Sequence, residues 1–265
     1  FHRSGVALAG ARVVGIAALY WATVALRPAS GEGVYAVLSH SAMVAIFLPA
    51  FVLPLLAIGI GLRRYWAEVG GAPVTLAHLL AAARSAATMR NLGGGQGQGC
   101  NFEDEDRFSN ARRHAHQAVM WGFLLCFAST SSGTVLHYLF HMQAPYPLFS
   151  LPKLFGVPGG LLLTVGAAAL VWLKTRADPA LGVPSAWGAE MAFVLLLGLS
   201  GLSGLVLYAA TGTAAVPGLL ALHLGAVLAL FLSTPYSKMA HGFFRMAALV
   251  RNAQTETAAG LRQSG

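Results

Sequence analysis

Charge is scarce in this 265-residue chain. Asp, Glu, Lys and Arg together make up 10% of the residues, whereas about 25% is usual in a soluble domain. Hydrophobic residues make up 56%, and the mean hydropathy is +0.65. This composition excludes an ordinary soluble globular protein and predicts a protein that crosses a membrane several times.

Cysteine is also scarce, with only Cys100 and Cys126 in the sequence. An iron–sulfur cluster takes about four cysteine ligands, so two cysteines exclude a cluster held by this chain alone. A disulfide is not expected either, because Cys126 falls inside an apolar segment and Cys100 falls in a loop.

Six apolar segments are present, and each is long enough to cross a bilayer as a helix, which takes about 20 residues. We therefore predict an all-α fold, a bundle of six transmembrane helices. The predicted helices cover residues 6–26, 34–62, 115–139, 157–173, 187–208 and 216–236.

Lysine and arginine gather on one side of this arrangement. Only Arg27 and Lys153 of the 17 fall on the other side. Cytoplasmic loops carry the excess of Lys and Arg, so we predict that both termini are cytoplasmic. The net charge of +8 then follows from topology, and nucleic-acid binding is not expected. The cytoplasmic cations are Arg3, Arg12, Arg63, Arg64, Arg84, Arg90, Arg107, Arg112, Arg113, Lys174, Arg176, Lys238, Arg245, Arg251 and Arg262.

The long segment between the second and third predicted helices is a cytoplasmic loop, residues 63–113. Within it, Thr75–Arg90 is predicted to form an amphipathic helix with Thr75 as its N-cap. The glycine run and acidic residues that follow match no phosphate-binding pattern, because no strand precedes them. A flexible docking loop is the favoured interpretation, and a role beside a redox centre is the alternative.

Histidine is the residue type that points to function, because an ionisable side chain inside a membrane is costly and usually functional. His223 and His241 are 18 residues apart. On one continuous helix this is five turns, which puts both on one face, about 27 Å apart. His116 and His137 differ by about 60° around their predicted helix, whereas His114 and His137 differ by about 140°.

Antiparallel neighbouring helices would join these histidines into two pairs, one in each leaflet. The inner pair would be His116 with His241, and the outer pair His137 with His223. Two axial imidazoles suit haem b, which then has no open coordination position and transfers electrons. Zinc needs three or four protein ligands and fits less well. His40, and His141 one turn beyond His137, stay open as alternatives to His137.

Several other residues are candidates for supporting roles. Gly198, Gly201 and Gly204 recur at every third position and would leave room for a flat macrocycle, although helix packing explains them equally well. Four cations could neutralise haem propionates near the inner pair, or follow from topology alone: Arg112, Arg113, Lys238 and Arg245. Three outer-side residues could contact a quinone: His40, Tyr138 and Lys153.

Two resemblances to known families rest on local motifs. The stretch HLGAVLALFLSTPYSKMAH, residues 223–241, resembles the last haem-binding helix of the respiratory nitrate reductase gamma subunit, where the same interval separates two haem-ligating histidines. A wider set of motifs is similar to the TcuB (or CitB) family of tricarballylate and citrate utilisation. These motifs are GGGQGQGCNFEDE, ARRHAHQAVMWGFLLCFAST, VLHYLF, APYPLFSLPKLFG and LVWLKTRADPALG.

The second resemblance implies a function. It implies that the chain sits in the bacterial inner membrane, reoxidises a cytoplasmic FAD-dependent tricarballylate dehydrogenase (TcuA-like), and passes the electrons through two b haems to quinone. The paired histidines of the family fall at His116 and Gln117, which favours His116 over His114. Family members also normally begin with an iron–sulfur domain. That domain is absent from this sequence, so iron–sulfur clusters would belong to a missing domain or to a partner.

Two other hypotheses compete with electron transfer. One is a six-helix transporter, for which the support is the set of polar groups within the membrane and a second span interrupted by Pro49 and Pro54. The other is a haem-free membrane anchor whose histidines pack without metal.

Overall fold

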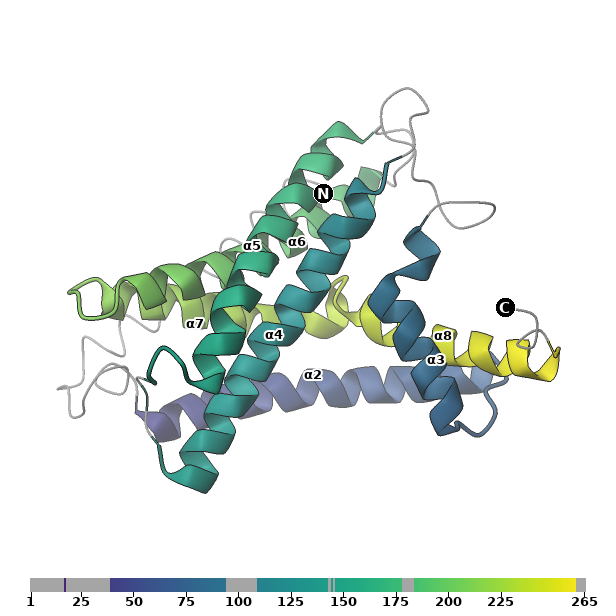
Figure 1. Ribbon diagram of the computed structural model, residues 1–265, viewed down its shortest axis with the longest axis horizontal. Coiled ribbons are helices and arrows are strands. Elements are labelled where there is room, and N and C mark those ends of the chain that lie inside the picture. The colour runs from purple at the N-terminus through teal and green to yellow at the C-terminus, as the bar shows by residue number, and fades with distance from the viewer. Residues whose placement is uncertain are drawn as a thin grey trace. The chain divides into compact units, whose positions relative to one another are not determined.

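The computed structural model describes Ala17 and residues 39–93, 109–142, 144, 146–177 and 184–260. Within these ranges all the regular structure is helical (Figure 1). The all-α prediction is confirmed for this part of the chain. The predicted helix over residues 6–26 and the glycine-rich and acidic stretch around Cys100 lie outside the described residues.

Seven α-helices make up the described structure. They are α2 (His40–Glu68), α3 (Leu76–Thr88), α4 (Ala111–Phe140), α5 (Leu151–Arg176), α6 (Pro184–Ala209), α7 (Val216–Ser233) and α8 (Ala240–Ala258). Among them, five are long and apolar enough to cross a membrane: α2, α4, α5, α6, and α7 with the turn that follows it. Hydropathy predicted all five. The complete six-helix bundle with cytoplasmic termini stays a prediction.

The spanning helices are longer than the apolar segments from which they were predicted. α2 continues past residue 62 to Glu68, and α4 begins at Ala111 instead of residue 115. Hydropathy marks the part of a helix that sits in hydrocarbon, whereas the backbone hydrogen bonds continue through polar flanking residues. α5 begins at Leu151, six residues early, with Pro152 in its first turn, where the missing N–H of proline costs nothing.

The spanning helices carry many exposed apolar side chains. Leu53 on α2 is 63% exposed and Val165 on α5 is 65% exposed. Exposed apolar surface of this extent is unusual in a soluble protein and is typical of helices that face lipid. The chain is therefore a membrane protein.

The chain divides into two compact units. Unit 1 comprises Phe1–Ala50 and His114–Leu232, and its described helices are the start of α2, nearly all of α4, and α5, α6 and α7. Unit 2 comprises Phe51–Arg113 and Ser233–Gly265, and it holds the rest of α2 together with α3 and α8.

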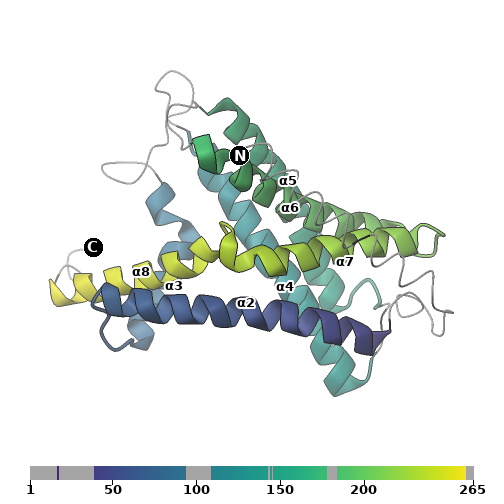
Figure 2. The same ribbon diagram turned by 180° about the vertical axis from the view of Figure 1, so that it is seen from behind.

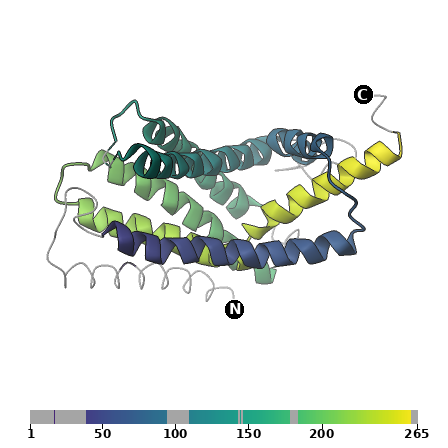
Figure 3. The same ribbon diagram turned by 90° about the horizontal axis from the view of Figure 1, so that it is seen from below.

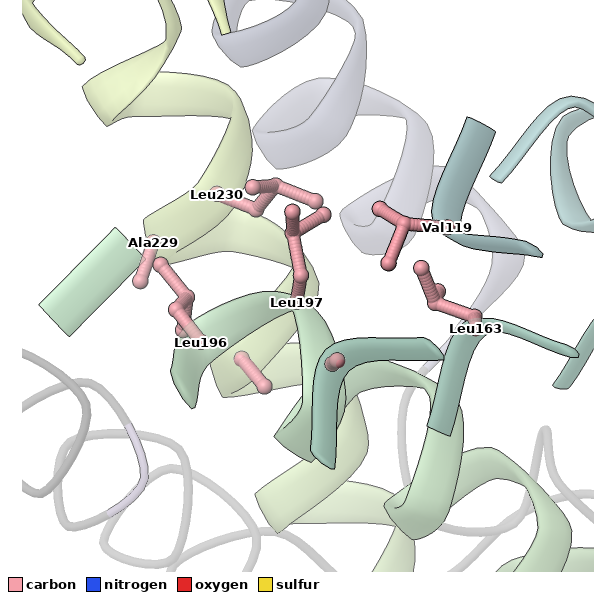
Figure 4. Close-up of a cluster of buried hydrophobic side chains, with 8 residues drawn as sticks. Val119, Leu163, Leu196, Leu197, Ala229 and Leu230 are labelled. Atoms are coloured by element: carbon pink, nitrogen blue, oxygen red, sulfur yellow. The ribbon is translucent and has the colours of Figure 1, made fainter. Parts of the chain in front are cut away.

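The core of unit 1 is a cluster of apolar side chains from four helices (Figure 4). α4 and α5 run side by side (Figures 1 and 2) and approach each other through glycine. A Cβ atom on Gly122 would lie 2.4 Å from the backbone nitrogen of Leu163, and one on Gly166 would lie 2.8 Å from that of Val119. Small residues at such crossings let helix backbones pack closely in membranes. The cluster comprises Val119, Leu163, Ala167, Leu196, Leu197, Ala226, Ala229 and Leu230.

We expect Gly122→Ala to destabilise the protein by about 1–3 kcal/mol, because the methyl group would meet backbone that cannot rotate away. The matched control is Gly59→Ala on α2, where nothing lies within 4 Å of the Cβ position and alanine favours the helix. Thermal unfolding of the purified protein, followed by circular dichroism, compares the two. An unchanged midpoint for Gly122→Ala would contradict the close approach of α4 and α5.

Unit 2 is held together by side chains that bond the ends of its helices. The buried Gln254 of α8 accepts from the backbone N–H of Ala72 and donates to the carbonyl groups of Ala72 and Pro73. Arg113 donates from Nη2 to the Thr88 carbonyl at 2.7 Å, at the last turn of α3, where helix carbonyls lack intrahelical partners.

The predicted N-cap of the loop helix is confirmed. The Thr75 hydroxyl accepts from the backbone N–H of His78, and the His78 ring accepts from the backbone N–H of Thr75. This reciprocal pair is a capping box in which histidine stands where glutamate is usual. The helix itself is slightly shorter than predicted, Leu76–Thr88.

The prediction that His223 and His241 lie on one continuous helix is wrong. α7 ends at Ser233, a 3₁₀ turn covers Thr234–Tyr236, and α8 begins at Ala240. Ser237 between them is extended, with φ −114° and ψ 175°, and Pro235 has no N–H to continue the helix. The five-turn geometry that placed His223 and His241 on one face therefore does not apply. The candidacy of each histidine as a ligand does not depend on it.

Candidate functional site

His223 of α7 lies within unit 1, against α6. Its Nδ1 is 3.1 Å from the Ser203 hydroxyl, and that hydroxyl donates to the Ser200 carbonyl at 3.4 Å. When the Ser203 proton is used in this way, the hydroxyl accepts from Nδ1–H of the ring. A neutral imidazole protonated at Nδ1 presents its lone pair at Nε2. Hydrogen bonding through the other ring nitrogen is how ligating histidines are oriented.

The three regularly spaced glycines of α6, Gly198, Gly201 and Gly204, have two different roles. A Cβ on Gly198 would lie 3.2 Å from Ala167, and one on Gly201 would lie 2.8 Å from the Thr164 hydroxyl, so both glycines serve the packing of α6 on α5. Gly204 is different, because its Cβ would lie 3.0 Å from Cε1 of His223. Helix packing therefore explains two of the three glycines, and the third makes room for an imidazole.

A second histidine cluster joins the first residue of α2 to the last turn of α4. The rings of His40 and His137 stack with centroids 4.3 Å apart and planes inclined by 28°. Nε2 of His40 is 2.8 Å from the Tyr138 hydroxyl, and the Tyr138 ring meets both imidazoles edge-on. Figure 3 shows the start of α2, the end of α4 and the start of α7 at the same end of unit 1.

Two of the three candidates for the outer ligand are thus neighbours, and the third is not placed as predicted. α4 ends at Phe140, and His141 beyond it is exposed with φ +54°. A residue in this left-handed conformation does not continue the helical face of His137. The prediction that His141 lies one helical turn beyond His137 is wrong.

At the other end of α4, the structure separates two nearby histidines. His114 is exposed, whereas His116 is half-buried and its Nδ1 is shielded from solvent. His116 precedes the buried Val119 by three residues and Phe123 by seven, so all three share a face. This arrangement agrees with the preference for His116, whose role as a ligand stays a prediction.

His241 lies in the first turn of α8. The carbonyl of Lys238 accepts a hydrogen bond from its Nδ1. As with His223, a neutral ring in this state presents its lone pair at Nε2. The pairing of His241 with His116, and of His223 with His137, stays a prediction.

The four cations predicted to neutralise haem propionates lie in different environments. Arg112, Lys238 and Arg245 are exposed. Arg113 instead bonds the carbonyl end of α3, so it has a structural role that the sequence did not reveal. Nζ of Lys153, a quinone candidate, lies 3.6 Å from the centroid of the Tyr208 ring.

Haem and a metal ion held by several side chains need different sets of ligands. No three His, Cys, Asp or Glu side chains converge on a common point within the described ranges, whereas zinc needs three or four such ligands. Haem iron needs only two axial imidazoles. Two of the predicted ligands, His223 and His241, have Nδ1 engaged by an oxygen, and Gly204 lets α6 approach His223 closely.

Ser203 is the site residue that sequence reasoning missed. It belongs to the run GLSGLSG, residues 198–204, in which serine and glycine both recur every third residue. The glycines of this run drew attention to small residues. The serines recur with the same period on an adjacent face, and one of them, Ser203, makes the hydrogen bond to His223.

Comparisons with known proteins point to one family. The family model for citrate utilization protein B matches residues 4–262. The chain is also 38% identical over 226 residues to citrate utilization protein B of Escherichia coli, an alignment covering 85% of this chain and 59% of that protein. The chain thus spans less than two thirds of the length of this relative. No solved structure matches.

Proposed function

Since this chain belongs to the citrate utilization protein B family, we propose that it is a dihaem b electron-transfer protein linking a cytoplasmic flavoprotein dehydrogenase to membrane quinone. The relative in Escherichia coli is named for citrate utilisation. We extend that role to this chain and propose that its partner oxidises a tricarboxylate of the tricarballylate type.

The environment of His223 is the observation that carries this proposal. A histidine inside a membrane is costly and usually functional. Here Nδ1 lies 3.1 Å from the Ser203 hydroxyl, which orients the ring, and Gly204 lets α6 approach that ring closely. This combination suits an axial ligand.

The proposed ligand set follows from the histidines already placed. His137 and His223 would ligate an outer haem iron, and His116 and His241 an inner one. Haem iron held by two imidazoles supplies one-electron transfer with no open coordination position. Ser203 and the Lys238 carbonyl would orient two of the ligands, and the exposed Arg112, Lys238 and Arg245 offer positive charge for propionates on the inner side.

The proposed location is the bacterial inner membrane, with the partner on the cytoplasmic side. Five apolar helices support the membrane assignment. An FAD-dependent dehydrogenase of the TcuA type would deliver the electrons. Because two cysteines cannot ligate an iron–sulfur cluster, any cluster on the path would belong to another domain or to a partner.

The transporter hypothesis has lost one of its supports. It drew on a second span interrupted by Pro49 and Pro54, but α2 is helical without interruption from His40 to Glu68. A transporter and a haem-free anchor become outcomes of the experiment that tests the proposal.

The experiment is optical and uses the purified full chain. Reduction with dithionite is expected to give the sharp α band of low-spin haem b. After the excess reductant is removed under anaerobic conditions, decylubiquinone or menadione is expected to bleach that band as the electrons pass to quinone. A spectrum with no α band would favour the transporter or the anchor. A band that stays reduced in the presence of either quinone would contradict the proposed acceptor.

A further inference from the structure

The cluster of His40, His137 and Tyr138 at the end of α4 contains a hydrogen bond that neither the proposed haem ligation nor helix packing requires. Tyr138 is 56% exposed, yet its hydroxyl is 2.8 Å from Nε2 of the half-buried His40. Tyrosine at the edge of a membrane is common, because the ring stays apolar while the hydroxyl reaches water. That explanation accounts for the exposed phenol of Tyr138. It does not account for the hydrogen bond between this phenol and the imidazole of His40, which belongs to another helix.

We infer that His40 and Tyr138 form a binding site for the headgroup of a quinone, an inference that rests on the proposed function. Their hydrogen bond can run in either direction, because each partner can donate or accept. When Nε2–H of His40 donates to the tyrosine oxygen, the tyrosine proton is directed outward and can bond a quinone carbonyl. When the tyrosine donates to Nε2, its oxygen can accept from a quinol hydroxyl. One pair of side chains thus recognises both redox forms.

The surroundings of Tyr138 suit a lipid-soluble ligand. The neighbouring Val135, Leu139 and Phe140 are all exposed on the last turns of α4. In a membrane these side chains face the acyl chains, so a headgroup with an isoprenoid tail could reach Tyr138 from the lipid without crossing water.

The site also adjoins a proposed haem ligand. The His137 ring stacks on His40 at 4.3 Å and meets the Tyr138 ring at 5.0 Å between centroids. A headgroup bonded to Tyr138 would therefore lie next to the imidazole proposed for the outer iron. Quinone exchange is then expected at the outer haem, a choice that the sequence left open.

Binding of the fluorescent quinone analogue 2-heptyl-4-hydroxyquinoline N-oxide to the purified full chain tests this site. Its fluorescence quenching gives a Kd, and displacement by decylubiquinone shows that both share one site. Tyr138→Phe and His40→Ala are each expected to raise the Kd about five- to tenfold, with the haem content unchanged. Tyr208→Phe is the matched control, since it removes a hydroxyl but keeps the ring beneath Lys153, and its Kd should match the wild type.

The outcomes separate this inference from the proposed function. Wild-type affinity in Tyr138→Phe would overturn the site. Loss of one haem in His40→Ala would also overturn it, because His40 would then be an axial ligand. A wild-type protein without haem would overturn the proposed function before any quinone analogue is added. The comparison of Tyr138→Phe with Tyr208→Phe would still decide whether the site exists.

Discussion

Substituting alanine for His223 is expected to lower the haem content of the purified protein from about two to about one per chain. The imidazole is held by Ser203 within unit 1, and Gly204 stands where a side chain would collide with the ring. Alanine would leave the iron without one of its two proposed imidazole ligands. The remaining haem should keep its α band, since its ligands come from other residues.

His141→Asn is the matched control for His223→Ala. His141 is exposed, lies beyond the end of α4, and has φ +54°, a conformation that asparagine tolerates. Its haem content should equal that of the wild type. Pyridine haemochrome assays on protein of known concentration measure both variants. If His223→Ala kept both haems, His223 would be a structural histidine and the outer ligand set would be wrong.

The second large effect is expected at the start of α4, where His114 and His116 form a natural matched pair. His116→Ala should lose one haem, because this ring is half-buried on the face that carries Val119. His114→Ala should lose none, because that ring is exposed. The two substitutions remove the same group two residues apart, so they share any general effect on the helix.

The same assay, together with the redox titration of the α band, distinguishes the outcomes for this pair. His116→Ala should retain one haem that titrates as a single one-electron component. The opposite result, with a haem lost from His114→Ala and none from His116→Ala, would move the inner ligand to His114. It would also contradict the orientation of α4 in unit 1.

The five spanning helices of the described structure were predictable from sequence, because a single physical requirement decides them. An apolar run of about 20 residues has few alternatives to a spanning helix, so hydropathy found α2, α4, α5, α6 and α7. The ends were less predictable. Residues such as Arg63 and Glu68 are polar, yet they continue α2, because helical hydrogen bonds do not stop where the lipid does.

The break between α7 and α8 shows where a periodic argument fails. The interval from His223 to His241 fits five helical turns, and nothing in hydropathy marks an interruption before Tyr236. The local signal was Pro235, which removes a backbone donor, followed by Ser237 in an extended conformation. Spacing alone could not show that the helix ends between the two histidines.

The candidate site was predictable in its residue types and less so in its contacts. Helical periodicity assigns His137 to a face, but it says nothing about which helix meets that face. The stacking of His40 on His137 depends on how α2 and α4 pack. In the same way, the period of Gly198, Gly201 and Gly204 indicated a stripe of small residues, and only packing separates the two that meet α5 from the one that meets His223.

The most direct test of the dihaem assignment is the ratio of haem to protein in the purified wild-type chain. Pyridine haemochrome absorbance against protein determined by amino-acid analysis should give close to two b haems per chain. A ratio near zero in protein expressed with ample haem would contradict the electron-transfer role altogether. A ratio near one would contradict the two pairs, His116 with His241 and His137 with His223.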